Sequence, residues 1–158
     1  MRDSMSHYLI REATERDQAA LIRHRVRMFE DMGRRFDASD LSERYRVWLA
    51  DMMARGTYRG WVAEDASTIV AGGGITLLPW PPGPHYPGPR LAFVYNVYTE
   101  PEHRNRGLGR RIMEAIHAWC RTEGIVSLAL NASEFGRSLY ESMGYRVTDS
   151  PMMFLSLD

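Results

Sequence analysis

The residues best suited to chemistry lie in a short basic segment, in which two glycines come just before a long helix-like pattern. At Gly107 and Gly109 a ligand can approach the backbone closely, because glycine has no side chain. The first N–H groups of a helix have no partner within it and lie at the positive end of its dipole. Positive side chains flank them, namely Arg104, Arg106, Arg110 and Arg111. The segment therefore predicts a cradle for an anion such as phosphate, unless the glycines only serve a turn before a solvated helix.

The sequence matches neither of two common phosphate-binding loops. The chain contains no G-x-x-x-x-G-K-[ST] loop, and no G-x-G-x-x-G opens a βαβ unit. The segment instead has the form R-x-x-G-x-G, from Arg104 to Gly109. The cradle is therefore neither that of a P-loop protein nor that of a dinucleotide-binding domain.

Hydrophobic periodicity places this segment between a strand and a helix. Residues 91–99 are rich in aromatic and β-branched side chains, which predicts a strand. Apolar side chains at helical spacing then predict a helix from Leu108 to about Gly124. The run 125–130 is almost continuously apolar, as in a strand covered on both faces. The cradle is thus expected at the carboxyl end of a strand.

The rest of the chain supplies further helices and strands around this core. We expect a strand at 8–11, helices over about 15–32, 41–52 and 135–143, a hairpin at 60–71 and a last strand at 152–157. The three glycines at 72–74 indicate a bulge or close packing rather than a phosphate loop, since no helix follows them. These elements predict a single α/β domain, with helices on both faces of a mixed central sheet.

Composition excludes several classes of function. The 158 residues are 44% apolar and 25% charged, and 20 basic side chains balance 20 acidic ones, so nothing suggests a nucleic acid or a membrane as partner. No apolar run is long enough to span a bilayer, and the polar start at residues 1–4 predicts no signal peptide, so we expect the cytoplasm. The single cysteine, Cys120, predicts a small buried side chain, and the five histidines lack ligand spacing, so we expect no metal.

Two blocks of the sequence resemble the GNAT superfamily of acetyl-CoA-dependent N-acetyltransferases. The stretch from Arg104 to Gly109 resembles the family's pyrophosphate motif, [Q/R]-x-x-G-x-[G/A], and Thr99-Glu100-Pro101 occupies the preceding V-x-P slot with threonine as a departure. Residues 131–145 are similar to the family's "N…LYexlGF" ending, with tyrosine in the last position. The resemblance extends from about Tyr8 to Leu157 and includes the order of the elements.

This resemblance implies where acetyl-CoA would bind. The strands on either side of the motif helix would splay apart, and the pantetheine arm would lie in the wedge between them. Backbone groups at the end of the central strand would pair with that arm like an added strand. The implied cofactor-binding residues are Val97, Tyr98, Thr99, Arg104, Asn105, Arg106, Gly107, Leu108, Gly109, Arg110, Asn131, Ser133 and Ser138.

The resemblance also implies catalytic roles. Tyr140 occupies the slot of the family's usual general acid, which protonates the CoA thiolate, although its helical stripe also fits a packing role. Many relatives carry a glutamate or histidine base on the central strand, but the corresponding positions here hold Phe93 and Tyr95. We therefore expect Tyr95 to hold a water that passes the proton of the amine to Glu64 or to an acid of the first helix.

The acceptor site is expected beside the end of the first helix. Phe29 and Glu30 would line it with Asp31, and Trp80 and Tyr86 of the proline-rich loop would close over it. Carboxylates beside aromatic rings suit a cationic amine. The alternatives are that the two acids are a solvated helix end and that the loop is a mere connector.

The resulting hypothesis is one N-acetyltransferase domain, residues 1–158, that moves an acetyl group from acetyl-CoA to a primary amine by direct attack in a ternary complex. The acceptor is a small amine or a peptide, whose identity the sequence leaves open. A homodimer joined through a sheet edge or the proline-rich loop is compatible with the sequence. The alternative is a non-catalytic acyl-CoA-binding regulatory module, because it would share the same cradle.

Overall fold

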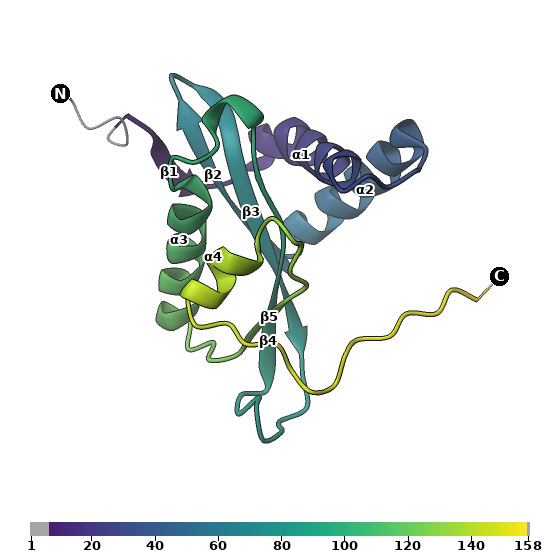
Figure 1. The fold of residues 1–158 in the computed structure, drawn as a ribbon, viewed down its shortest axis with the longest axis vertical. Coiled ribbons are helices and arrows are strands. Elements are labelled where there is room, and N and C mark those ends of the chain that lie inside the picture. The colour runs from purple at the N-terminus through teal and green to yellow at the C-terminus, as the bar shows by residue number, and fades with distance from the viewer. Residues whose placement is uncertain (1–6, 158) are drawn as a thin grey trace.

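A computed structural model describes residues 7–157 and shows one central sheet with helices on both of its faces (Figure 1). The polar start at residues 1–4, which predicts no signal peptide, lies outside the described residues. Within the described part of the chain, no helix is long and apolar enough to cross a membrane.

The sheet has five strands in the order β1-β2-β3-β4-β5. They are β1 (Leu9–Glu12), β2 (Tyr58–Asp65), β3 (Thr68–Pro79), β4 (Arg90–Thr99) and β5 (Leu128–Leu130). The first four are antiparallel neighbours, whereas β4 and β5 run parallel. The predicted mixed sheet is therefore confirmed. β5 is shorter than the apolar run 125–130 because only three of those residues pair with β4.

The described residues also form four α-helices and two short 3-10 helices. They are η1 (Glu15–Asp17), α1 (Gln18–Asp31), α2 (Ala38–Ala54), η2 (Pro101–His103), α3 (Leu108–Thr122) and α4 (Arg137–Ser142). α1 and α2 cover one face of the sheet, and α3 covers the other (Figure 1). Buried side chains form a core on each face, with Leu21, Leu49 and Val62 on the first and Ile112, Ile116 and Cys120 on the second.

The three consecutive glycines of β3 let both helical layers approach the sheet. A Cβ atom added at Gly73 would lie 2.9 Å from the Ile112 side chain of α3, and one added at Gly72 would lie 3.6 Å from the Leu21 side chain of α1. The register of β3 against β4 also shifts between Gly72 and Gly74. The prediction of a bulge with close packing is therefore confirmed.

The predicted strand at 152–157 is wrong, because this segment pairs with no strand of the described chain. It leaves the body after α4 as an extended tail (Figure 1), and Met153 and Phe154 are 92% and 93% exposed. Its apolar residues have the intrinsic preference of a strand, but a strand also needs a neighbouring backbone to accept and donate its hydrogen bonds.

Candidate active-site cleft

β4 and β5 pair over only three residues each and then separate, which opens a cleft of about 1430 Å³. The pairs are Ala92 with Leu128, Phe93 with Ala129 and Val94 with Leu130. The cleft walls come from β4, from the segment 103–110 at the start of α3, from the segment 130–140, and from α1 and α2. The predicted splayed strand pair is therefore confirmed.

A kink in β4 shapes the wall of this cleft. Asn96 has a left-handed backbone, with φ of 61°, and it lies where β4 carries an extra residue opposite Gly73. Its side-chain amide donates a hydrogen bond of 3.2 Å to the carbonyl of Leu21 and so ties the kink to α1. Such a bulge turns the following residues relative to the ladder, here Val97. The sequence offered one signal for it, an asparagine in a strand of aromatic and β-branched residues, because asparagine tolerates this conformation.

The basic segment before α3 has the geometry of an anion cradle. Asn105 and Gly107 have left-handed φ values of 62° and 74°, and Gly107 is the residue on which α3 begins. No described residue accepts a hydrogen bond from the backbone N–H groups of residues 105–110. These groups are therefore available to an anionic ligand at the positive end of a 15-residue helix.

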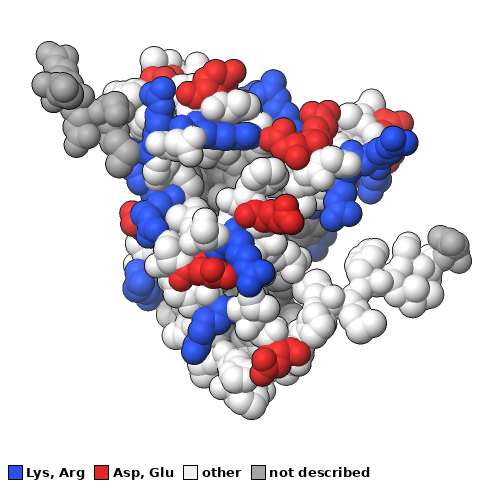
Figure 2. All heavy atoms as spheres, viewed as in Figure 1, with Lys and Arg blue, Asp and Glu red and all other residues white. Residues whose placement is uncertain are grey.

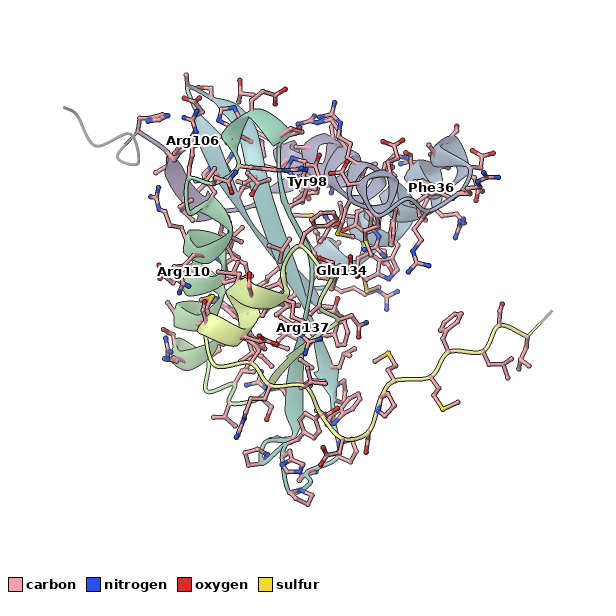
Figure 3. The ribbon with its side chains drawn as sticks, viewed as in Figure 1. Phe36, Tyr98, Arg106, Arg110, Glu134 and Arg137 are labelled. Atoms are coloured by element: carbon pink, nitrogen blue, oxygen red, sulfur yellow. The ribbon has the colours of Figure 1, made fainter. Side chains whose placement is uncertain are left out.

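The arginines of this segment are held by neighbouring groups. Arg104 donates to the carbonyl of Thr99 at 2.9 Å and forms an ion pair with Asp31 at 2.7 Å. Arg106 reaches the hydroxyl of Tyr8, and Arg110, on the first turn of α3, reaches Ser142. Figure 3 labels Arg106, Arg110 and Tyr98, the last of which lies under the Arg104 guanidinium at 5.4 Å. Apart from the helix dipole, the cradle thus carries fixed positive charge at its edge.

A buried acid that the sequence did not single out anchors the cradle to α1. Glu100, the residue after β4, is 8% exposed and forms ion pairs with Arg23 and Arg27. Burial alone would raise its pKa, but the hydrogen bond from Arg23 and the charge of Arg27 hold the pKa below its usual value. His24 lies 3.4 Å away, and burial lowers its pKa to about 4, so the imidazole is neutral. Glu100 therefore joins the base of the cradle to the helix on the opposite wall.

Tyr140 lies on α4 with its ring in the cleft wall. It is 9% exposed, and burial raises its pKa, so the phenol keeps its proton at neutral pH. Its ring packs edge-on against Tyr145 at 5.9 Å and lies close to the backbone of Gly136. Asn131 and Ser133 also line the cleft, whereas Ser138 is not among its lining residues.

Tyr95 lines the cleft on the side of α1 and α2. Its hydroxyl lies 2.6 Å from that of Thr76, and burial raises its pKa far above the neutral range. Tyr45 and Trp48 of α2 also line this side, where the Trp48 ring lies 6.0 Å from that of Tyr95. Glu64, the expected outer proton acceptor, does not line the cleft and instead forms an ion pair with Arg11 at 2.6 Å.

The residues expected around the acceptor fall into two groups. Phe29 and Asp31 line the cleft, but Asp31 is already paired with Arg104. Glu30 faces a separate shallow hollow on α1, and Trp80 and Tyr86 contact each other in the loop between β3 and β4, away from the cleft. The visible face of the molecule carries interspersed acidic and basic side chains (Figure 2).

No metal site accompanies this cleft in the part of the chain that the structure describes, residues 7–157, because no three His, Cys, Asp or Glu side chains group together there. The described cleft offers backbone N–H groups, arginines and four tyrosines, namely Tyr45, Tyr95, Tyr98 and Tyr140. These can bind an anionic ligand and protonate a leaving group.

Comparisons with known proteins agree with this geometry. The family model of the acetyltransferase (GNAT) domain matches residues 56–147. A GCN5-related N-acetyltransferase from Ralstonia eutropha JMP134 is 34% identical, with a TM-score of 0.85 over 94% of this chain and 98% of that one. A predicted acetyltransferase from Clostridium acetobutylicum, with acetyl-CoA, is 25% identical, with a TM-score of 0.80 over 96% of each chain. Among curated proteins, no sequence is significantly similar.

Proposed function

Because the chain belongs to the GNAT acetyltransferase family, we propose that it transfers an acetyl group from acetyl-CoA to a primary amine by direct attack in a ternary complex. One observation carries the proposal: the cradle residues Asn105 and 107–110, whose N–H groups are open, line the same cleft as Tyr140, whereas Arg106 is not among the lining residues. The cleft thus offers a site for the pyrophosphate and, within reach of the same ligand, a proton donor. The residues 1–158 would form a single N-acetyltransferase domain.

The proposed cofactor site runs along β4 to the start of α3. The backbone of Val97, Tyr98 and Thr99 would pair with the pantetheine arm, since β5 has turned away at this level. The N–H groups of the cradle would bind the pyrophosphate, and Asn131 across the cleft would hold the amide part of the arm. The similar protein from Clostridium acetobutylicum was solved with acetyl-CoA, which supports acetyl-CoA as the ligand.

In the proposed reaction, the nitrogen of the amine bonds to the thioester carbon and the carbon–sulfur bond breaks. Tyr140 would donate its phenolic proton to the leaving sulfur, a role that its raised pKa supports because the phenol enters the reaction protonated. Tyr95 would hold the water that takes the proton of the amine and passes it to the solvent, since its hydroxyl and that of Thr76 form a polar pair at the cleft wall. The described cleft wall offers no carboxylate for that step, because Asp31 is paired with Arg104.

The function is tested by mixing the purified protein with acetyl-CoA and a panel of primary amines and following free thiol. We expect thiol release that depends on the amine, with the acetylated amine identified by mass. Calorimetry with acetyl-CoA alone provides the second measurement. Acetyl-CoA binding without thiol release from any amine would contradict the transferase and leave the acyl-CoA-binding regulatory module.

We also propose that the protein forms a homodimer through its tail, residues 151–157. The tail is apolar and exposed, and the outer edge of β5, the last strand of the sheet, has no strand partner among the described residues. An unpaired sheet edge and an extended segment can pair with each other between two copies. Light scattering after gel filtration should give a dimer for the whole chain and a monomer for a chain that ends at Ser150. A whole chain that elutes as a monomer would refute the proposal.

A further inference from the structure

Arg25 lies on the side of the cleft formed by α1 and α2, here called the acceptor end, and has no ionic partner among the described residues. Arg25 projects from α1 into the cleft wall, and its guanidinium carbon lies 5.0 Å from the ring centroid of Tyr45, 5.1 Å from that of Phe29 and 5.7 Å from that of Tyr95. No carboxylate or hydrogen-bond acceptor of Arg25 occurs among residues 7–157. The aromatic rings therefore position the guanidinium, while its N–H groups have no hydrogen-bond acceptor among the described residues.

The surroundings of Arg25 do not supply a negative charge. Asp31 is the single acid among the described residues that line the cleft, and it already forms an ion pair with Arg104. Burial raises the pKa of Tyr45 to about 12, so this hydroxyl stays neutral beside the guanidinium. The nearby Arg44 also lines the cleft, and Asp40 pairs with it at 2.8 Å. Arg34 also lines the cleft, and no acid among the described residues pairs with it. This side of the cleft therefore has an excess of positive charge, and Arg25 is the part of it that lies among aromatic rings.

We propose that the acceptor is a primary amine that carries a carboxylate, and that Arg25 binds this carboxylate. A guanidinium fits a carboxylate with two parallel hydrogen bonds, and one cation balances one carboxylate. A phosphate carries nearly two negative charges, whereas this cluster of rings holds one guanidinium among the described residues, that of Arg25. This inference rests on the proposed acetyl transfer and names its substrate class.

The rings around Arg25 extend the proposal to the rest of the acceptor. Tyr45 and Trp48 stack at 5.7 Å, and the Trp48 and Tyr95 rings meet edge to face. They form an apolar wall beside the guanidinium, which suits an aromatic or aliphatic side chain on the acceptor. The cationic amine expected from Glu30 and Asp31 would lack both acids, because Glu30 lies outside the cleft and Asp31 is paired with Arg104, and further positive charge on it would be repelled by Arg25. Amines with a side chain and a carboxylate are therefore the class that fits.

The test uses pairs of amines that differ by the carboxylate alone, namely phenylalanine and 2-phenylethylamine, tyrosine and tyramine, and leucine and 3-methylbutylamine. The measured quantity is the ratio of kcat/KM within each pair, for the wild type, Arg25→Gln and Arg25→Lys. We expect Arg25→Gln to lower the ratio by about 10- to 100-fold, through the KM of the acid, because a charged hydrogen-bonded pair is lost. Arg25→Lys should keep part of the ratio, and the acetyl-CoA affinity should stay unchanged. Arg16→Gln, an exposed change outside the cleft, is the matched control.

Each outcome decides the question. Equal losses for the acid and the neutral amine in Arg25→Gln would overturn the inference, and so would a preference of the wild type for the phosphonic analogue of phenylalanine or for spermidine. Turnover of the neutral amines shows that the variants are folded. Acetylation of amines without any carboxylate preference would refute the substrate class alone, whereas acetyl-CoA binding with no acetylation of any amine would refute the proposed transferase.

Discussion

The backbone of Gly136 sets the position of the Tyr140 ring, which gives a test of the general acid that leaves its hydroxyl in place. A Cβ atom added at Gly136 would lie 2.8 Å from Cε2 and 3.3 Å from Cζ of Tyr140. Ordinary carbon contacts are about 3.5–4.0 Å, so the ring must move by about 1 Å in Gly136→Ala. The backbone itself accepts alanine, because φ of Gly136 is −97°. A misplacement of about 1 Å costs a catalytic group about 10²-fold in rate.

We therefore expect Gly136→Ala to lower kcat by about 10- to 100-fold while acetyl-CoA affinity and the circular dichroism spectrum stay unchanged. Steady-state thiol release gives kcat, and calorimetry gives the affinity. Gly83→Ala is the matched control, because no atom lies within 4 Å of its added Cβ. In the double variant with Tyr140→Phe, the two losses should fail to add, since both act on one proton transfer. A kcat within twofold of the wild type in Gly136→Ala would refute the reasoning that the position of this ring limits the reaction.

Four further changes probe the cradle, the proton path and the fold. Gly107→Glu should abolish acetyl-CoA binding in calorimetry, because a carboxylate would enter the cradle. Gly56→Glu is the control for backbone strain, because Gly56 has a similar φ of 69°, and this variant should bind acetyl-CoA normally. Tyr95→Phe should lower turnover by about 3- to 30-fold. Glu64→Gln should change turnover by less than about twofold, because Arg11 holds that acid outside the cleft. A loss above a thousandfold in either variant would show a dedicated base. The hydrogen bond from Arg11 lowers the pKa of Asp17 in the folded protein. The ionised carboxylate therefore stabilises the folded state fully above about pH 4, and this stabilisation is lost as the pH falls through the folded-state pKa. At pH 7, urea unfolding should therefore give Asp17→Asn a free energy of unfolding about 1–3 kcal/mol below that of the wild type. This difference in stability should vanish at acidic pH. A difference that does not change with pH would contradict a stabilising ion pair.

The sequence predicted the parts of the site that are contiguous along the chain. The strand, the loop with Gly107 and the helix that follows are neighbours in sequence, so periodicity and glycine placement were enough to locate an open helix start. The prediction of a strand at 152–157 was wrong because a strand forms only when it pairs with another segment, which the residues of the strand itself do not specify.

The acceptor end of the cleft could not be predicted in this way. Arg25, Tyr45 and Tyr95 come from α1, α2 and β4, and each by itself resembles an ordinary amphipathic position. Glu30 was an attractive ligand because it lies next to Phe29 in sequence, but successive helical residues point about 100° apart, so it faces another hollow. The rotation of a helix about its axis is set by packing, which the sequence alone does not specify.

The most direct test of the account is a comparison of the wild type with Tyr140→Phe in two assays of the same sample. The account predicts equal acetyl-CoA affinity in calorimetry and amine-dependent thiol release that is about 10²-fold slower in the variant, because the hydroxyl that protonates sulfur is the single group removed. Equal turnover in the two proteins would contradict the role of Tyr140. Absence of amine-dependent thiol release from a wild type that binds acetyl-CoA would contradict the account as a whole.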